Sequence, residues 1–571
     1  MNHVLITGTT MMQSNFESLN THKTTLEQAI NANKTREFYA HWPEAPSGKI
    51  YGETANADGQ AAFQSKLNHP FEGLVQNGAN GSVGEEVSPF GFPLGITYPS
   101  YSVDTLVNNA KEAQIEWRKI SVETRALILI ECLERAAKHY FEIGYATMHT
   151  SGQGFVMAFQ ASGPHAFDRA LEAVAMGVSA LDSFNTTSEW TKPMGKMSVT
   201  LHKKFFAVPK GINATIGCST FPLWNSLPGM FASLITGNAT IAKTHPKVTL
   251  PMAIFVASCQ QTLLDLGVNP HIIQLVADSS SAPITFELAG HPAIKLIDYT
   301  GSAAVGSKLE SIAAQNQKTI FTEKVGVNCA VIESVENLDA VLDNLAFGMT
   351  LYSGQMCTAP QNFFIPKEGV SENGVLIPLD EVAKRFTAKI DALVFNEKIG
   401  PGTLGALQNE NTLERIKTAE GLDAITLRPS ASIAQPGFEH SRTVSPLLLQ
   451  VKPSQTDIYE SEWFGPIGFI IPVDSFDAAI SIITDSAAKH GSLSTSVYTT
   501  DHTKQAMAEE AIIYAGAPVA FNFTGPIWVN QSAAFSDFHG TGANPAGSAA
   551  FADMSFVCNR YNVIGSREKV G

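Results

Sequence analysis

The sequence predicts an α/β protein with a doubly wound parallel sheet, a second α/β domain and a small oligomerisation ribbon. The chain has 571 residues, more than one hydrophobic core usually organises. Apolar strands alternate with helical segments between positions 211 and 326, and this alternation is typical of a parallel sheet. Residues 196–209 alternate apolar and polar side chains, which indicates an exposed two-stranded ribbon.

The central βαβ pattern gives the order of the elements. We expect helices at about 224–236 and 250–266, a third helix after Gly301, and strands at 211–217, 238–245, 271–278, 294–301 and 319–326. A doubly wound sheet of this kind is the usual platform for a dinucleotide.

The flanking segments define the other predicted domains. Residues 1–105 look irregular and rich in turns, so we expect an N-terminal extension packed on the cofactor domain. That domain comprises 106–190 and 210–322, and a second, catalytic α/β domain follows at 323–540. Because a polar ribbon is marginal alone, 191–209 and 541–571 should pair with another subunit, giving a homodimer or a dimer of dimers.

Composition limits the partners and the compartment. The net charge of −15 and the pI of about 5.5 disfavour nucleic acid and anionic membranes. Six cysteines without a CxxC pair, and no evident signal peptide, indicate reduced thiols. We see no apolar run of roughly 20 residues that would span a membrane. The sequence therefore predicts a cytoplasmic protein with neither nucleic acid nor membrane as partner.

Two glycine motifs could bind phosphate. The GxGxxG at 400–405 contains proline and has no acidic residue at the expected distance, so we interpret it as a loop. In YTGSAAVG (299–306) an apolar strand runs through Gly301 and Ser302 into a helix, whose free N–H groups would suit a pyrophosphate. A plain strand-to-helix turn explains that motif equally well.

Two residues could carry chemistry. Cys357 stands on an apparent turn in LYSGQMCTAPQNFF, although a cysteine taken alone is more often a buried apolar residue. Glu323 lies between apolar residues in TIFTEKVG and is either ion-paired or catalytic. HExxH and GxSxG motifs are absent, so the sequence predicts no metal site and no serine hydrolase.

Together the motifs resemble the aldehyde dehydrogenase superfamily over roughly 105–530. TEKVG falls at the family's E-L-G-G motif, and Glu323 precedes Cys357 by the spacing seen in typical members. The other matches to family motifs are SGQMC, GNATIAK (237–243), TGSAAVG and EWFGP (462–466). The resemblance implies an aldehyde dehydrogenase-like fold and oxidation of a small-molecule aldehyde with NAD or NADP.

The resemblance also implies roles for individual residues. Cys357 would be the nucleophile that forms a thiohemiacetal and then a thioester, and Glu323 would activate water for hydrolysis. The cofactor contacts would come from Lys243 and Glu462 at its riboses, Gly301 and Ser302 at the pyrophosphate, and Phe464 at the nicotinamide. The variants SGQGFVMAF and STFPLWN are most similar to the PaaN branch, which is associated with a CoA-linked ring-cleavage semialdehyde of phenylacetate degradation.

Two positions depart from the family pattern. Thr220 stands where the family usually has the asparagine that donates to the oxyanion, and Gly229 replaces a lysine. Loss of one oxyanion donor typically costs about 3 kcal/mol, so we expect Thr220 or Asn225 to serve as the second donor beside the Cys357 N–H.

The segment after Lys243 predicts NADP, with NAD possible. NAD-preferring members read K-P-S-E from the strand lysine, and the carboxylate that ends this motif is absent from Lys243-Thr-His-Pro246-Lys247. Thr244, His245 and Lys247 could contact a 2′-phosphate, or His245 and Lys247 could be solvated loop residues.

The sequence leaves three other functions as alternatives. An acylating, CoA-dependent dehydrogenase commonly lacks the glutamate at 323, and a silent scaffold fits poorly with intact Cys357 and Glu462. A thiol amidase would need a Cys–His pairing that the sequence motifs do not reveal.

Overall fold

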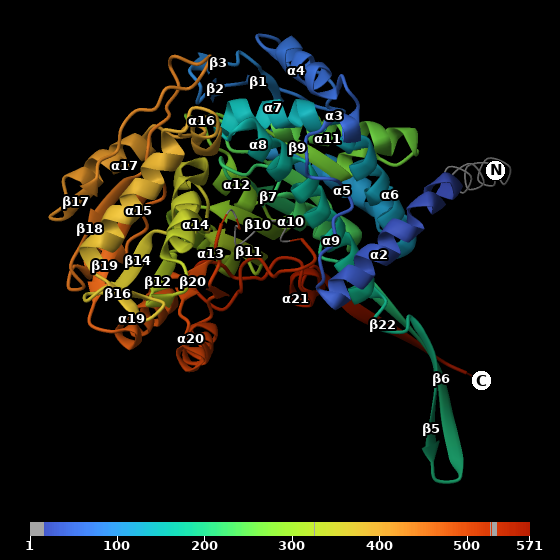
Figure 1. Ribbon diagram of the computed structural model, residues 1–571. Coiled ribbons are helices and arrows are strands. Elements are labelled where there is room, and N and C mark those ends of the chain that lie inside the picture. Colours follow the sequence, from blue (N-terminus) through green and yellow to red (C-terminus); the bar gives the residue numbers. More distant parts are fainter. Residues whose placement is uncertain (1–15, 325, 526, 528–533, 571) are drawn as a thin grey trace.

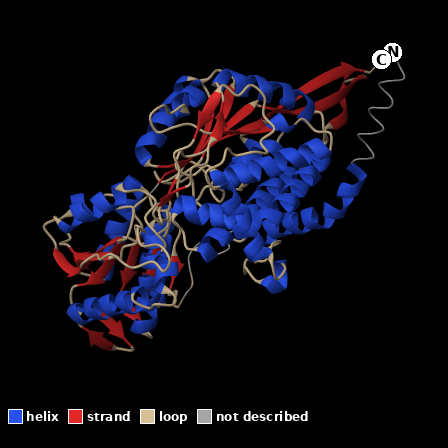
Figure 2. Ribbon diagram, turned by 90° about the horizontal axis from the view of Figure 1, so that it is seen from above, coloured by secondary structure: helices blue, strands red, loops and turns tan. Residues whose placement is uncertain are grey.

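The computed structural model describes residues 16–324, 326–525, 527 and 534–570. Two sheet-containing lobes form the body of the molecule, and a long ribbon projects from one of them (Figures 1 and 2). The arrangement has the two α/β lobes and the ribbon that the sequence predicts. Within the described residues, no helix is both long and apolar enough to cross a bilayer.

The first lobe contains a sheet of five parallel strands in the order β11-β10-β7-β8-β9. These strands are β7 (Ile212–Ile216), β8 (Ala239–Lys243), β9 (Ile273–Val276), β10 (Ile294–Gly301) and β11 (Thr319–Lys324). The chain runs outward from β7 to β9 and then returns to add β10 on the other side of β7. Ligands of doubly wound sheets bind at such a switch point, beyond the carboxyl ends of the two strands.

Helices cover this sheet, and the main ones are α5 (Val103–Trp117), α6 (Val122–Ala136), α9 (Pro164–Leu181), α10 (Leu227–Ile235), α11 (Leu250–Asp265), α12 (Thr285–Gly290) and α13 (Ala303–Gln315). Local sequence fixes several starts. The hydroxyls of Ser102 and Ser121 accept backbone N–H groups at the starts of α5 and α6, and Pro164 opens α9, where its missing N–H costs nothing.

The second lobe contains a seven-stranded sheet in the order β17-β18-β19-β14-β12-β20-β21. Only β17 is antiparallel to its neighbour. The strands are β12 (Cys329–Ile332), β14 (Asn362–Pro366), β17 (Ile425–Arg428), β18 (Leu447–Gln450), β19 (Ile467–Val473), β20 (Thr495–Tyr498) and β21 (Ala520–Phe521). The accompanying helices are α14 (Leu338–Thr350), α15 (Leu379–Val394), α16 (Gly400–Leu404), α17 (Asn411–Glu420), α18 (Thr456–Tyr459), α19 (Phe476–His490) and α20 (His502–Tyr514). The GxGxxG segment expected to be a loop is thus helix α16.

The ribbon is a three-stranded antiparallel sheet, which corrects the two-stranded ribbon expected at 196–209. β6 (Met197–Pro209) fills that whole segment, and it pairs with β5 (Thr187–Met194) and with the tail strand β22 (Tyr561–Lys569). The tail therefore completes the ribbon of its own chain. A turn at Gly195, with φ of 66°, joins β5 to β6.

The N-terminal segment is more regular than its composition suggests. It contains α2 (Lys23–Thr35), which packs on α9, and α4 (Ala55–Lys66), which packs on α7 (Tyr140–Ser151). Gly59 inside α4 faces Phe141 so closely that a Cβ would lie 2.3 Å from the Phe141 Cβ. Because glycine makes the closest contact of α4, the helix has a weak apolar periodicity in the sequence. Its helical structure depends on tertiary packing more than on local propensity.

Candidate active site

Two cavities meet at Cys357. One, of about 570 Å³, opens at the carboxyl ends of β7, β8 and β10, the switch point of the first sheet. The other, of about 590 Å³, is lined mainly by apolar side chains between α8 (Phe155–Ser162), α14 and α16. Phe221, Asn225 and Cys357 line both cavities. A thiol at this junction can be reached by two different molecules at once.

The backbone before Cys357 is strained. Tyr352 and Ser353 both have φ of 51°, a left-handed conformation that is unfavourable for residues other than glycine. Hydrogen bonds hold this turn, because the Tyr352 hydroxyl donates to the Ser151 carbonyl at 2.5 Å and the Ser353 hydroxyl to the Leu404 carbonyl at 3.0 Å. Strain maintained by its surroundings is a frequent feature of active sites.

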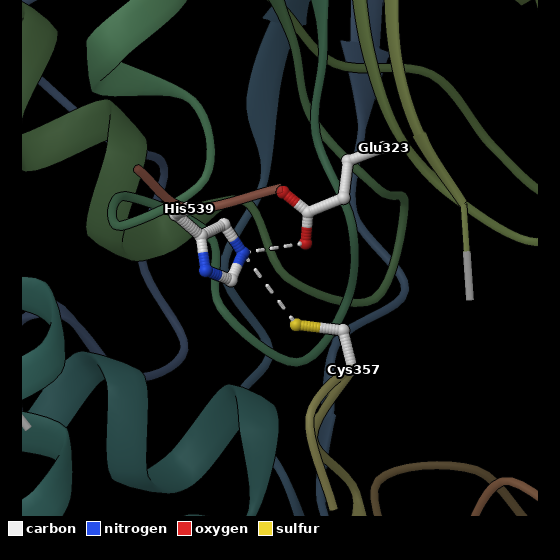
Figure 3. Close-up of side chains that lie close together, drawn as sticks. All are labelled: Glu323, Cys357 and His539. Atoms are coloured by element: carbon white, nitrogen blue, oxygen red, sulfur yellow. Dashed lines mark hydrogen bonds and ion pairs between the residues drawn. The ribbon is translucent and has the colours of Figure 1, made fainter. Parts of the chain in front are cut away.

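Glu323 and His539 complete a compact cluster around the thiol (Figure 3). The His539 Nε2 lies 3.1 Å from the Glu323 Oε1 and 3.8 Å from the Cys357 Sγ. Glu323 comes from β11 and is buried, as is His539 on the loop before α21 (Met554–Cys558). Sequence reasoning missed His539, because 182 residues separate it from Cys357 and no short motif marks it. The sequence motifs reveal no Cys–His pair, but the fold brings Cys357 and His539 together.

Burial and the neighbouring groups shift the pKa values of Cys357 and Glu323 in opposite directions. Burial, then the charge of Glu323 and its hydrogen bond, raise the pKa of the Cys357 thiol well above its usual range. Burial alone would raise the pKa of the Glu323 carboxyl, but His539, the Cys357 hydrogen bond and the Arg169 charge outweigh it and lower that pKa. The resting pair is therefore a neutral thiol beside a carboxylate.

The two expected oxyanion donors differ in which of the two cavities they line. Thr220 lines only the switch-point cavity, whereas Asn225 lines both. The Asn225 Nδ2 donates weakly to the Cys218 Sγ at 3.5 Å, and its buried Oδ1 has no hydrogen-bond partner in the described part of the chain. The free Oδ1 can only accept, so a bond to an oxyanion would come from the Nδ2 group, which has two hydrogens and makes one weak bond to Cys218.

The switch-point cavity has the features of a dinucleotide cradle. Gly301 has φ of +156°, and a Cβ there would lie 2.5 Å from the Tyr299 hydroxyl oxygen. Ser302 caps the 13-residue helix α13 without a side-chain hydrogen bond, so the first N–H groups of the helix remain available for phosphate. Glu462 and Phe464 lie on the same lining, and Arg415 donates to the Phe464 carbonyl at 2.5 Å. These residues fit a nicotinamide dinucleotide.

The expected adenosine-end residues differ in what they offer. Lys243 and His245 line the cavity, while Lys247 is not among the described residues of its lining. The Lys243 Nζ pairs with the Asp278 carboxylate at 2.7 Å. Burial, then the charges of Lys243 and Lys247, lower the pKa of His245 to about 4. His245 is therefore neutral at pH 7 without a ligand, and it can offer a hydrogen bond.

A buried cation unnoticed in the sequence supports the site. Arg169 on α9 is buried, and its guanidinium lies 4.1 Å from the centre of the Trp224 ring. Its Nε and Nη2 have no hydrogen-bond partner among the described residues. Burial lowers the pKa of Arg169, while the charges of Glu172, Glu323, Asp537 and Cys357 oppose that shift. A positive charge near Cys357 thus comes from α9 and not from position 229.

Comparison with known proteins agrees with this geometry. The model of the aldehyde dehydrogenase family matches residues 98–550. The crystal structure of an NAD-dependent aldehyde dehydrogenase from Burkholderia multivorans has a TM-score of 0.94 and 42% identity, covering 97% of this chain and 99% of that chain. An NADP-dependent glyceraldehyde-3-phosphate dehydrogenase from Bacillus halodurans, solved with NADP, shares the fold at a TM-score of 0.66 and 20% identity over 86% of this chain and 96% of that one. The NAD-dependent benzaldehyde dehydrogenase of Pseudomonas putida is 24% identical over 413 residues, 71% of this chain and 78% of that relative.

The protein belongs to the aldehyde dehydrogenase family, since the family model spans most of the chain. It is an NAD(P)-dependent aldehyde dehydrogenase, so the family resemblance drawn from the motifs is confirmed at this level.

Proposed function

We propose that the protein oxidises an aldehyde to a carboxylic acid through a thiohemiacetal and a thioester on Cys357. The observation that carries this proposal is the position of Cys357 at the junction of the two cavities. Cofactor in the switch-point cavity would approach the thiol from one side, and aldehyde in the apolar cavity from the other. When bound, the nicotinamide supplies the acceptor for hydride.

The remaining steps belong to residues of the chain. The Cys357 Sγ attacks the aldehyde carbon, and the Cys357 N–H with the Asn225 amide stabilises the oxyanion, Thr220 being the alternative second donor. Glu323 then accepts a proton from water, whose oxygen attacks the thioester and releases the acid. Glu323, ionised beside the thiol, favours hydrolysis over acyl transfer to coenzyme A and over a silent scaffold.

For the substrate, we propose the CoA-linked ring-cleavage semialdehyde suggested by the PaaN resemblance. The apolar cavity would hold the carbon chain, and Lys398 on its lining would meet an anionic group of the carrier. A free aromatic aldehyde is the second candidate, favoured by Phe155, Trp224 and Phe347 in the same lining. Comparing kcat/KM for both classes decides between them. Lys398→Ala should raise KM only for the CoA-linked aldehyde, with Lys384→Ala, an exposed lysine, as control.

For the cofactor, we propose NADP. The carboxylate that would repel a 2′-phosphate is absent from residues 243–247, where Lys247 adds a positive charge, and Lys243 neutralises Asp278 nearby. NAD is the second candidate, because Asp278 still offers a carboxylate to ribose hydroxyls. We expect a higher kcat/KM with NADP and a reduced NADP:NAD ratio in Lys247→Glu. A preference for NAD, or an unchanged ratio in that variant, contradicts the proposal.

We propose that the ribbon joins subunits into a homodimer or a dimer of dimers. Large apolar side chains are exposed along its strands: Trp190, Met194, Met197, Phe206, Val563 and Ile564. A sheet that extends from the body with such residues exposed is suited to burial against a second copy (Figure 1). Light scattering at micromolar concentration should give at least twice the chain mass, and a monomeric mass would exclude the interface.

The central test of the proposed chemistry is Cys357→Ala. This variant should lose turnover and retain cofactor binding, because the thiol is removed and the dinucleotide cradle is intact. Cys558→Ala, a half-buried cysteine beside the ribbon, serves as the matched control. Retention of most of the turnover in Cys357→Ala would exclude Cys357 as the nucleophile.

A further inference from the structure

The proposed function needs a thiolate that the resting site does not favour. Burial and the neighbouring Glu323 carboxylate keep the Cys357 thiol protonated, whereas only the thiolate attacks an aldehyde efficiently. The lysine that other family members carry is absent at Gly229. Another group must therefore stabilise the Cys357 thiolate after the thiol has lost its proton.

The tautomer of His539 follows from its contact with Glu323 (Figure 3). An ionised carboxylate can only accept hydrogen bonds, so at 3.1 Å the His539 Nε2 must carry the proton of that bond. The same N–H lies 3.8 Å from the Cys357 Sγ. The His539 Nε2–H can therefore donate to the Glu323 carboxylate or to the Cys357 thiolate, depending on which of the two carries the negative charge.

We propose that His539 is a catalytic residue whose Nε2–H bond passes from Glu323 to Cys357 during thiolate formation. The Sγ–H bond breaks and Glu323 takes the proton, so the carboxylate becomes a carboxylic acid and the thiol a thiolate. The His539 N–H then donates to the Sγ, where the negative charge now lies. After thiolate attack, Glu323 returns its proton to solvent and regains the His539 hydrogen bond before it activates water. The inference rests on the proposed function.

The surrounding charges fit this exchange. Arg169 lies near both anions, and its guanidinium has two unpartnered nitrogens among the described residues, so it supports whichever group is charged. The charges of Glu172 and Asp537 favour the charged form of Arg169, and burial first raises the pKa of Glu172 to about 7. Cys218 also contributes to the raised pKa of the Cys357 thiol. His539 contacts both groups directly through its Nε2.

Packing keeps the imidazole in place for both contacts. The His539 ring is 3% exposed and meets the Trp224 ring edge-on, with centroids 4.6 Å apart. Trp224 is itself held under the Arg169 guanidinium. A fixed ring can change partners only by a small movement of the Cys357 or Glu323 side chain, which suits two acceptors that alternate in charge.

Alkylation of the thiol tests the proposal without cofactor or aldehyde. The rate of iodoacetamide modification of the Cys357 peptide is measured against pH in Glu323→Gln protein, where no carboxylate competes for the donor, and in the same protein with His539→Leu, His539→Gln or the control His502→Gln, an exposed histidine. A hydrogen bond to a charged group is worth about 1.5–3 kcal/mol, so His539→Leu in this background should slow modification at pH 8 by about 10- to 100-fold and raise the apparent pKa. His539→Gln, which keeps an N–H near the Nε2 position, should remain within several-fold of the Glu323→Gln parent. With Glu323 present, His539→Leu should have a smaller effect, because it then removes the donor from both anions.

The outcomes separate the alternatives. An unchanged pH profile when His539→Leu is added to Glu323→Gln, or equal losses from the Leu and Gln substitutions in that background, would overturn the proposal. If leucine unfolds the loop, His539→Met provides the same comparison with a flexible side chain that also lacks a donor. Failure of the wild type to oxidise any aldehyde would refute the proposed function but leave the alkylation result valid for His539.

Discussion

The α-carbon of Gly229 faces the Asp298 carboxylate so closely that a Cβ would lie 2.4 Å from the Asp298 Cγ. Asp298 cannot move away easily, because Arg560 donates to its two oxygens at 2.8 and 2.6 Å and is itself fully buried. The chain therefore has no room for a lysine at 229, and the change from the family pattern is a consequence of the Asp298–Arg560 pair.

Gly229→Ala should destabilise the protein. Overpacking a well-filled interior typically costs 1–3 kcal/mol, and displacing a buried ion pair adds to this, so we expect a loss of at least about 2 kcal/mol. Thermal unfolding followed by fluorescence measures the effect. Gly290→Ala, where nothing lies within 4 Å of the new Cβ, is the matched control. Equal melting temperatures for the two variants would contradict the close packing at Gly229.

His149 should make stability depend on pH. Burial lowers its folded-state pKa to about 4, and its ring stacks on Phe63 at 4.9 Å. Between pH 6.5 and 4 the unfolded chain binds a proton that the folded chain does not, so stability falls as pH falls through this window. At pH 5 these values correspond to about 2 kcal/mol.

The measurement compares wild type with His149→Phe at pH 5 and pH 7.5. Phenylalanine keeps an aromatic ring but cannot titrate, so wild type should lose more melting temperature than the variant on acidification. The other histidines cancel in this difference. A difference in melting temperature that is the same at both pH values would show that His149 does not titrate in this window.

The N-terminal segment should influence catalysis through Arg36. Its Nη1 donates to the Phe535 carbonyl at 3.3 Å, and its guanidinium lies 3.8 Å from the centre of the Phe538 ring, next to His539. Phe535 has φ of 67° and needs such contacts to hold its strained backbone. Arg36→Asn tolerates the left-handed conformation of Arg36 but removes the guanidinium.

We expect Arg36→Asn to lower kcat by about tenfold, the value of one lost hydrogen bond of about 1–1.5 kcal/mol. Cofactor affinity should not change, because Arg36 does not line the switch-point cavity. The control is Lys34→Asn, an exposed residue of the same helix. An unaltered kcat in Arg36→Asn would show that the loop holds His539 without the N-terminal segment.

The sequence predicts the first sheet well, because each strand from β7 to β11 is a short apolar run bounded by a helix or a turn. It also places Cys357 and Glu323 in their motifs. It does not predict α4, whose contact with Phe141 is made through a glycine, or the ribbon's third strand, whose partner lies far away in the chain. The sequence does not predict the roles of His539 and Arg169 for the same reason. These roles depend on contacts across the fold, and neither residue stands in a motif.

Glu323→Gln should separate hydride transfer from hydrolysis. Cofactor reduction precedes deacylation, so the variant should give one equivalent of reduced cofactor and then turn over slowly. Because glutamine cannot take the Cys357 proton, that first equivalent should form more slowly than in wild type and should form faster as the pH is raised. Rapid-mixing absorbance at the reduced nicotinamide band measures both phases. A first equivalent that forms at the wild-type rate at pH 7 would show that Glu323 is not the group that takes the thiol proton.

The acyl-enzyme itself gives the most direct test of the central claim. Glu323→Gln is mixed with cofactor and an aldehyde at a pH where the first equivalent forms, quenched in acid, digested and mapped by mass spectrometry. The account predicts the acyl group on the peptide that contains Cys357, in an amount equal to the reduced cofactor. Cys218 also lines the switch-point cavity and is the internal comparison. An acyl group on Cys218, or reduced cofactor without any acylated cysteine, would contradict the account.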